Sequence, residues 1–276
     1  MKFVIGICFA TLLVIANGFS VADKRARITD GKTAKPGQFP YQVSIQFGLP
    51  PFIPLSHSCG GSIIDELHIL TAAHCASGIL GKLGKHLVKA GKHSLSKDED
   101  YTQTVEVASK IIHEGYPNTL FPKVAQHDIA ILKLKTPLIF NEFIQPVQLP
   151  KPDSIQTGGS ILSGWGSVSK TTLPELPEIL QYAEIPIIDF KTCKSAIEKE
   201  GDDAPLFDTM ICTGPLGGSI SACSGDSGGP LVQYENSKPL IVGIVSWGFM
   251  PCGTSGAPSV FTRVSSYIDW IKANSA

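Results

Sequence analysis

The chain has 276 residues, and its 23 basic residues nearly balance its 24 acidic residues, which leaves a net charge of −1. This balance gives no electrostatic reason to expect nucleic acid as a partner. The length is sufficient for one large domain or two small ones.

The first residues predict a secretory signal peptide over residues 1–22. Lys2 precedes an almost unbroken apolar run at 3–16, which is too short for a comfortable membrane span. Small residues at Ser20 and Ala22 fit a cleavage site after Ala22, with cleavage after Gly18 as the alternative. We therefore expect a secreted, extracellular protein with no membrane contact.

Strand-like segments, rich in Val and Ile and separated by Gly, Pro and Asn, dominate the remaining chain. They cover residues 41–47, 62–70, 104–112, 129–134, 160–164, 231–234 and 240–247. Apolar residues at helical spacing predict a C-terminal helix, and a second short helix is expected over 190–199. The residues behind the C-terminal prediction are Val264, Ile268 and Ile271, with Ser265 and Ser266 as candidate caps.

A proline-rich apolar insert at 48–55 lies just before Cys59. We interpret it as a stiff surface loop. The alternative is a rim that contacts substrate residues beyond the bond that is cut.

Three motifs carry the chemistry. Residues 71–75 (TAAHC) supply His74, residues 127–132 (HDIAIL) supply Asp128, and residues 223–231 (CSGDSGGPL) supply Ser227 between glycines. Serine alone is a weak nucleophile, so it needs a base and a group that orients the base. These motifs, in the order His, Asp, Ser, resemble the chymotrypsin-like (trypsin-fold) serine peptidases over about residues 28–276.

The resemblance implies an all-β fold of two six-stranded antiparallel β-barrels with a C-terminal α-helix. We set the barrels at residues 28–144 and 145–276, with the active site between them. In the implied mechanism Ser227 attacks the scissile carbonyl, His74 transfers the proton and Asp128 orients the imidazole. The backbone N–H groups of Gly225 and Ser227 would form the oxyanion hole.

Six cysteines remain once the signal peptide, with Cys8, is removed. An even number in a secreted chain favours disulfides, but six cysteines allow fifteen pairings. The resemblance implies the pairs Cys59–Cys75, Cys193–Cys212 and Cys223–Cys252.

We expect no metal and no cofactor. A zinc site of His57, Cys59, His74 and Cys75 is the weaker alternative to the disulfides, because these residues lack a compact Cys-x-x-Cys knuckle. A calcium site at 98–100 (DED) is also weaker than a solvated charge run, because Lys92 stands where calcium-binding members have a carboxylate.

The resemblance also implies an inactive precursor. Residues 23–27 would be an activation peptide, and a trypsin-like protease would cut the bond between Arg27 and Ile28. The new amino group of Ile28 would then pair with a buried Asp226, because a lone buried carboxylate needs a cation.

The family sets specificity with a pocket floor and two wall positions, which correspond here to Ser221, Gly248 and Ser259. The strand of Ser246 and Trp247 leads into the first wall. None of these residues is acidic, so a basic side chain would be buried unpaired. We expect cleavage after Phe, Tyr or Leu, with elastase-like or collagenolytic specificity as the alternative.

The pocket is closest to those of chymotrypsins, and we expect a monomeric digestive enzyme, such as an invertebrate digestive chymotrypsin. Its partners would be protein and peptide substrates, a trypsin-like activating protease and protein protease inhibitors. A venom or immune-cascade protease is a further alternative. So is a catalytically silent homologue that acts as a binding protein.

One position departs from the resemblance. His127 stands where the family more often has asparagine, and the change would alter the surroundings of Asp128.

Overall fold

The computed structural model describes residues 31–77, 84–117, 124–169, 171–201 and 204–276. The expected signal and activation peptides, with Arg27 and Ile28, lie outside these residues. Among the residues that the structure describes, no helix combines the length and apolar character needed to cross a membrane.

The first barrel closes in the strand order β2-β3-β4-β7-β6-β5, and every pairing is antiparallel. Apolar side chains from these strands fill its interior. Each fully buried Val, Leu or Ile contributes about 1.5–3 kcal/mol of transfer free energy. The strands are β2 (Gln42–Leu49), β3 (Ile53–Ile63), β4 (His68–Thr71), β5 (Lys85–Ala90), β6 (Gln103–Ile112) and β7 (Ala130–Leu134).

The second barrel closes in the order β8-β9-β10-β13-β12-β11, because β8 pairs with both β9 and β11. The strands are β8 (Gly158–Gly164), β9 (Gln181–Ile188), β10 (Met210–Thr213), β11 (Pro230–Glu235), β12 (Lys238–Trp247) and β13 (Ser259–Arg263). A two-residue strand, β1 (Lys32–Thr33), pairs with β9 and so joins the N-terminal end of the described chain to this barrel. The predicted fold of two six-stranded antiparallel barrels is confirmed.

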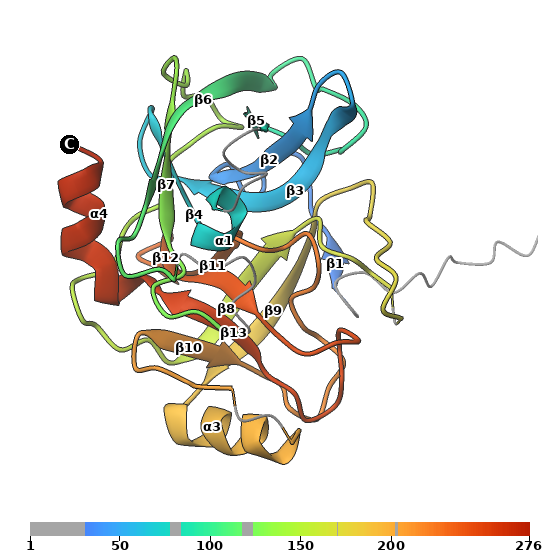
Figure 1. The fold of residues 1–276 in the computed structure, drawn as a ribbon, viewed down its shortest axis with the longest axis vertical. Coiled ribbons are helices and arrows are strands. Elements are labelled where there is room, and N and C mark those ends of the chain that lie inside the picture. Colours follow the sequence, from blue (N-terminus) through green and yellow to red (C-terminus); the bar gives the residue numbers. More distant parts are fainter. Residues whose placement is uncertain (1–30, 78–83, 118–123, 170, 202–203) are drawn as a thin grey trace, which may run out of the picture.

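Figure 1 shows the first barrel above the second, with the short helix α1 (Ala73–Ala76) where they meet. One buried cluster spans both barrels and includes Leu70 and Ile131 from the first, and Trp165, Ile244 and Ile268 from the second. The predicted boundary near Gln145 falls in the connection between β7 and β8. The shared cluster fixes the barrels against each other, which matters because the predicted triad is divided between them.

The predicted strand at 62–70 is wrong, because this stretch contains a hairpin. β3 ends at Ile63, and β4 begins at His68. The Asp65 carboxylate accepts hydrogen bonds from the backbone N–H groups of Leu67 and His68, both at 2.8 Å, and these bonds close the turn. The apolar pattern is continuous because residues on both sides of the turn are buried.

The proline-rich insert is the tip of another hairpin and is mostly strand. β2 runs to Leu49 and β3 begins at Ile53, and the turn between them is closed by a 2.8 Å hydrogen bond from Phe52 N to Leu49 O. The Phe52 side chain is 88% exposed at this tip. Strand pairing, and not proline alone, therefore stiffens the insert.

The C-terminal helix forms, but its predicted caps are wrong. Val264–Tyr267 is a 3-10 turn (η1), and the α-helix α4 covers Ile268–Asn274. Ser265 lies within η1, and its hydroxyl donates to Ser154 O at 2.7 Å instead of capping the helix. The other predicted helix, α3 (Phe190–Lys199), has the expected bounds.

Candidate active site

His74 lies on α1, directly after β4. Its neighbour Cys75 forms a disulfide with Cys59 of β3, which joins the helix to the barrel wall. The hydroxyl of Thr71, at the end of β4, donates to Gly60 O at 2.9 Å. Covalent and hydrogen-bonded links therefore fix the segment that carries the imidazole.

Asp128 orients this imidazole from the connection just before β7. Its Oδ2 lies 2.8 Å from His74 Nδ1, and its Oδ1 accepts the His74 backbone N–H at 2.9 Å. Because a carboxylate only accepts, the Nδ1 atom carries the proton, which leaves Nε2 free to act as a base. The His74 side chain remains 32% exposed, whereas Asp128 is 4% exposed.

The electrostatics of this pair favour its charged forms. Burial opposes a charged imidazole, but the charge and hydrogen bond of Asp128 outweigh burial and raise the pKa of His74. Burial likewise opposes the Asp128 charge, yet His74 and the Ser246 hydroxyl together lower the pKa of that carboxyl. The arrangement thus stabilises the imidazolium that forms when His74 accepts a proton.

Ser227 lies where two tight turns meet. The first is closed by a 2.9 Å bond from Asp226 N to Cys223 O, and the second by a 2.8 Å bond from Gly229 N to Asp226 O. Gly225 has a φ of 102° in this segment, a backbone conformation that side chains with a Cβ rarely adopt. The sequence forms this turn because glycine stands at that point.

Two carbonyl groups of the turn accept hydrogen bonds from other backbone groups. Ser224 O accepts from Ser167 N at 2.8 Å, and Asp226 O accepts from Gly229 N. A trans peptide directs its N–H opposite its C=O, so the N–H groups of Gly225 and Ser227 point away from those partners.

Contacts across the barrel interface bring Ser227 toward His74. Gly60 N donates to Ser227 O at 2.8 Å. A Cβ added to Gly228 would lie 2.1 Å from Thr71 Oγ1 and 3.1 Å from Ala72 N, so the serine turn packs against the residues that lead into α1. The serine turn and the segment that leads to His74 therefore lie against each other where the two barrels meet.

A cavity of about 220 Å³ opens beside Ser227. Three predicted substrate-binding residues line it, namely Ser246, Trp247 and Gly248. The rest of its described lining is uncharged and consists of Ala222, Cys223, Ser224, Val245, Phe249, Met250 and Cys252. A charged substrate group would find no opposite charge in that lining.

Ser221 and Ser259 stand behind this lining. Ser221 Oγ accepts from Gly253 N at 2.7 Å, and Ser259 Oγ accepts from Ala222 N at 3.0 Å. Ser259 is only 3% exposed. Both hydroxyls thus bind the backbone of the pocket walls.

Asp226, the predicted activation carboxylate, is completely buried. It accepts from Gly166 N at 2.7 Å and from Cys223 N at 3.0 Å. Burial raises the pKa of this carboxyl to about 6, although both hydrogen bonds act to lower it. Its predicted partner, Ile28, lies outside the described residues.

Sequence reasoning missed several residues of the site. Ser246 was expected only at the substrate, but its hydroxyl also donates to Asp128 Oδ2 at 2.6 Å. Thr262 Oγ1 donates to Asp128 O at 2.8 Å, and Phe249 and Met250 extend the cavity wall. Continuing the predicted wall beyond Gly248 would have found Phe249 and Met250, whereas no local signal marks Thr262.

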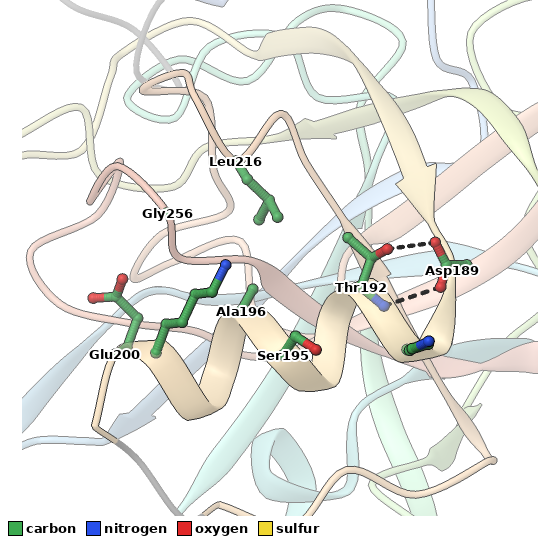
Figure 2. A pocket seen from close by; sticks show the side chains of 9 residues that line it. Asp189, Thr192, Ser195, Ala196, Glu200, Leu216 and Gly256 are labelled. Atoms are coloured by element: carbon green, nitrogen blue, oxygen red, sulfur yellow. Dashed lines mark hydrogen bonds between the residues drawn. The ribbon is translucent and has the colours of Figure 1, made fainter.

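A larger groove, of about 620 Å³, lies along α3 and contains no triad residue in its lining. Figure 2 shows Leu216 and Gly256 facing the helix across it. The Asp189 carboxylate caps the helix by accepting from Thr192 N at 2.9 Å and from Thr192 Oγ1 at 2.6 Å. The groove thus lies beside a well-capped helix, apart from the catalytic cavity.

All three disulfides implied by the resemblance are formed. They join Cys59 to Cys75, Cys193 to Cys212, and Cys223 to Cys252. The zinc alternative is therefore wrong, because the sulfurs of Cys59 and Cys75 are bonded to each other and offer no thiolate.

At the alternative calcium site, the side chain of Lys92 already supplies a positive charge. The Lys92 side chain is fully buried, and its ammonium group lies 2.9 Å from Asp98 Oδ1 and 4.0 Å from Glu99 Oε2. Two of the three acidic residues considered as ligands therefore already face a positive charge.

Known proteins match nearly the whole of this chain. A family model described as Trypsin matches residues 28–271. Trypsin-1 of Astacus astacus is 38% identical over 250 residues, which cover 90% of this chain and 99% of the relative. Coagulation factor IX of Cavia porcellus is 36% identical over 90% of this chain and 82% of its own length.

Serine proteinase stubble of Drosophila melanogaster is 33% identical over 91% of this chain, but over only 31% of its own length. The fold, the gathered motifs and these matches lead to one conclusion. The chain belongs to the trypsin family of serine proteases, which are hydrolases that act on protein substrates.

Proposed function

We propose that the protein is a secreted serine endopeptidase, made as an inactive precursor, that cleaves after large apolar residues. Ser227 Oγ attacks the scissile carbonyl carbon while its proton moves to His74 Nε2. That proton then passes to the leaving amine, and an acyl-enzyme remains. Water, deprotonated by His74, hydrolyses the acyl-enzyme and regenerates Ser227.

The proposed specificity rests on one observation, the uncharged lining of the cavity beside Ser227. Trypsin-like cleavage after Lys or Arg needs a negative charge in the pocket, because an unpaired buried cation is costly. The predicted floor residue is Ser221, whose hydroxyl is engaged by Gly253 N. Gly248 leaves the cavity entrance without a side chain, which favours Phe, Tyr and Leu.

Peptide anilides that differ only in the residue before the scissile bond test this preference. We expect the highest kcat/KM for Phe, Tyr or Leu and the lowest for Arg. Highest turnover of the Ala substrate would establish the elastase-like alternative. An Arg optimum would contradict the proposed pocket.

The precursor proposal rests on Asp226. A buried carboxylate whose pKa is raised to about 6 is poorly compensated by two backbone N–H groups, and a nearby cation would stabilise its charge. The family match begins at residue 28, directly after Arg27, where cleavage would create the Ile28 amino group. Pairing of that group with Asp226 would hold Gly225 and Ser227 in the orientation that binds the oxyanion.

Trypsin treatment of the wild-type chain and of an Arg27→Gln variant tests activation. We expect activity to appear in the wild type together with a new N-terminus at Ile28, while the variant stays inactive. Full activity of the uncleaved variant would contradict the proposal.

Digestion is the physiological role that we propose, with a trypsin-like enzyme as activator. Three disulfides support folding in an oxidising compartment, which agrees with secretion. Immunostaining for the chain in gut and in venom or blood-cell tissue tests the role. Absence from the gut would favour the venom or immune-cascade alternative.

A further inference from the structure

The imidazole next to the catalytic carboxylate is half of a stacked pair. His127, directly before Asp128, has a φ of 60°, in the left-handed region that few residues other than glycine adopt. Its ring lies parallel to that of His113, with 4.6 Å between centroids and 6° between planes. Gly115 makes room for this stack, because a Cβ there would lie 2.7 Å from His127 Cδ2.

Two aromatic residues that follow the second barrel's last strand, Tyr267 and Trp270, pack on this stacked pair. The hydroxyl of Tyr267, at the end of η1, lies 3.0 Å from His127 Nδ1. Its ring meets both imidazoles edge-on, at centroid distances of 5.3 Å from His113 and 5.8 Å from His127. On α4, Trp270 packs on His113 at 5.2 Å and donates from Nε1 to Glu114 at 3.0 Å. The C-terminal helix, beside the first barrel in Figure 1, is thus tied to it.

Hydrogen bonds hold the backbone on both sides of Asp128. His127 O accepts from Ile129 N at 2.8 Å, and Ile129 O accepts from His113 N at 3.2 Å. Across the barrel interface, Thr262 Oγ1 donates to Asp128 O. Rotation at His127 would therefore move the carboxylate that holds His74.

We propose that His127 is a positioning residue, which fixes Asp128 by tying the backbone before it to Tyr267 of the second barrel. The stack on His113 and the hydrogen bond to Tyr267 hold the left-handed backbone, and that backbone aims the carboxylate at His74 Nδ1. The inference rests on the proposed function, because it assigns Asp128 the orienting role in peptide-bond cleavage.

Two substitutions at His127 test the proposal: one removes the imidazole ring, and the other restores a polar side chain. His127→Ala removes the stack and the hydrogen bond, and we expect kcat to fall about 10- to 100-fold with KM unchanged, as for a displaced catalytic group. His127→Asn keeps a side chain that tolerates the left-handed region and can bond Tyr267, so it should regain kcat to within about threefold of wild type.

His68→Ala is the matched control. His68 is also buried, and its Nδ1 lies 2.9 Å from the Asp65 carboxylate, but it does not line the catalytic cavity. We expect this variant to lower the melting temperature and leave kcat unchanged. A folded His127→Ala enzyme with wild-type kcat would overturn the proposal, as would an equal loss of kcat in His68→Ala.

Tyr267→Phe carries the same test if His127→Ala does not fold. It removes one hydroxyl, so kcat should fall and the low-field proton resonance of His74 Nδ1 should shift. An unchanged kcat and resonance would contradict the proposal. The resonance does not require turnover, so an inactive wild-type protein that retains it would refute the proposed function without refuting the role of His127.

Discussion

The two buried carboxylates of the candidate active site, Asp128 and Asp226, have opposite electrostatic surroundings. Asp128 faces an imidazole and accepts further hydrogen bonds, which lower its pKa despite burial. Asp226 accepts two backbone N–H groups, and burial raises its pKa to about 6. The difference teaches that hydrogen bonds alone do not compensate a buried charge here, whereas a cationic partner does.

The comparison predicts its largest effect at Asp128. Asp128→Asn should lower kcat about 10⁴-fold, because the amide no longer selects the imidazole tautomer with Nε2 free. Asp65→Asn is the matched control, since Asp65 also binds a histidine, His68, outside the cavity. Steady-state kinetics on a Phe anilide measures both, and a similar loss in the two variants would contradict the orienting role of Asp128.

A smaller loss is expected when the second carboxylate is neutralised. Asp226→Asn in the cleaved enzyme should lower kcat about 10²- to 10³-fold, the range for one lost oxyanion donor. The same change in the uncleaved Arg27→Gln chain should leave its activity at the same low level, because Asp226 has no activation partner there. Wild-type kcat in the cleaved variant would show that activation does not depend on Asp226.

The raised pKa of Asp226 also predicts how stability depends on pH. Between about pH 4 and pH 6 the folded uncleaved chain binds the proton that the unfolded chain releases, so stability falls as pH rises through this window. A shift of roughly two pKa units corresponds to about 3 kcal/mol. Asp128 contributes in the opposite direction, since its lowered pKa adds stability that is lost as pH falls.

Urea unfolding of Arg27→Gln chains with Asp or Asn at position 226 isolates this contribution. Across the window, the chain with Asp226 should lose about 3 kcal/mol relative to the chain with Asn. Equal pH profiles would show that the carboxyl at 226 keeps an ordinary pKa.

The smallest effect concerns a single hydrogen bond of Asp128. Ser246→Ala removes the 2.6 Å bond to Oδ2 and should lower kcat about tenfold, near the lower end for a bond to a charged group. Ser160→Ala is the control, because its buried hydroxyl donates to Ile185 O at 2.7 Å and neither residue lines the catalytic cavity. A loss of the same size in both would mean that the hydroxyl of Ser246 has no special effect on Asp128.

The fold class and the site residues were predicted from three motifs and the family that these motifs resemble. The helix at 190–199 was also expected, and it forms with those bounds. The hairpin at Asp65 was missed because buried strands on both sides of a turn give one continuous apolar run. The strands β5, β9, β10 and β13 were also missed, because polar side chains occupy some of their buried positions, namely His86, Gln181, Thr213 and Ser259.

Side-chain directions within the site could not be predicted either. Ser246 and Thr262 reach Asp128 from strands more than 100 residues away. The partnership of His127 with Tyr267 spans 140 residues. Such contacts depend on how the two barrels pack, which no local pattern encodes.

Labelling with a radiolabelled organophosphonate, before and after trypsin cleavage, tests the central claim most directly. The account predicts one label per molecule, on Ser227, only after the bond between Arg27 and Ile28 is cut, with no label on trypsin-treated Arg27→Gln. Equal labelling of the uncleaved chain, or a label on another residue, would contradict it.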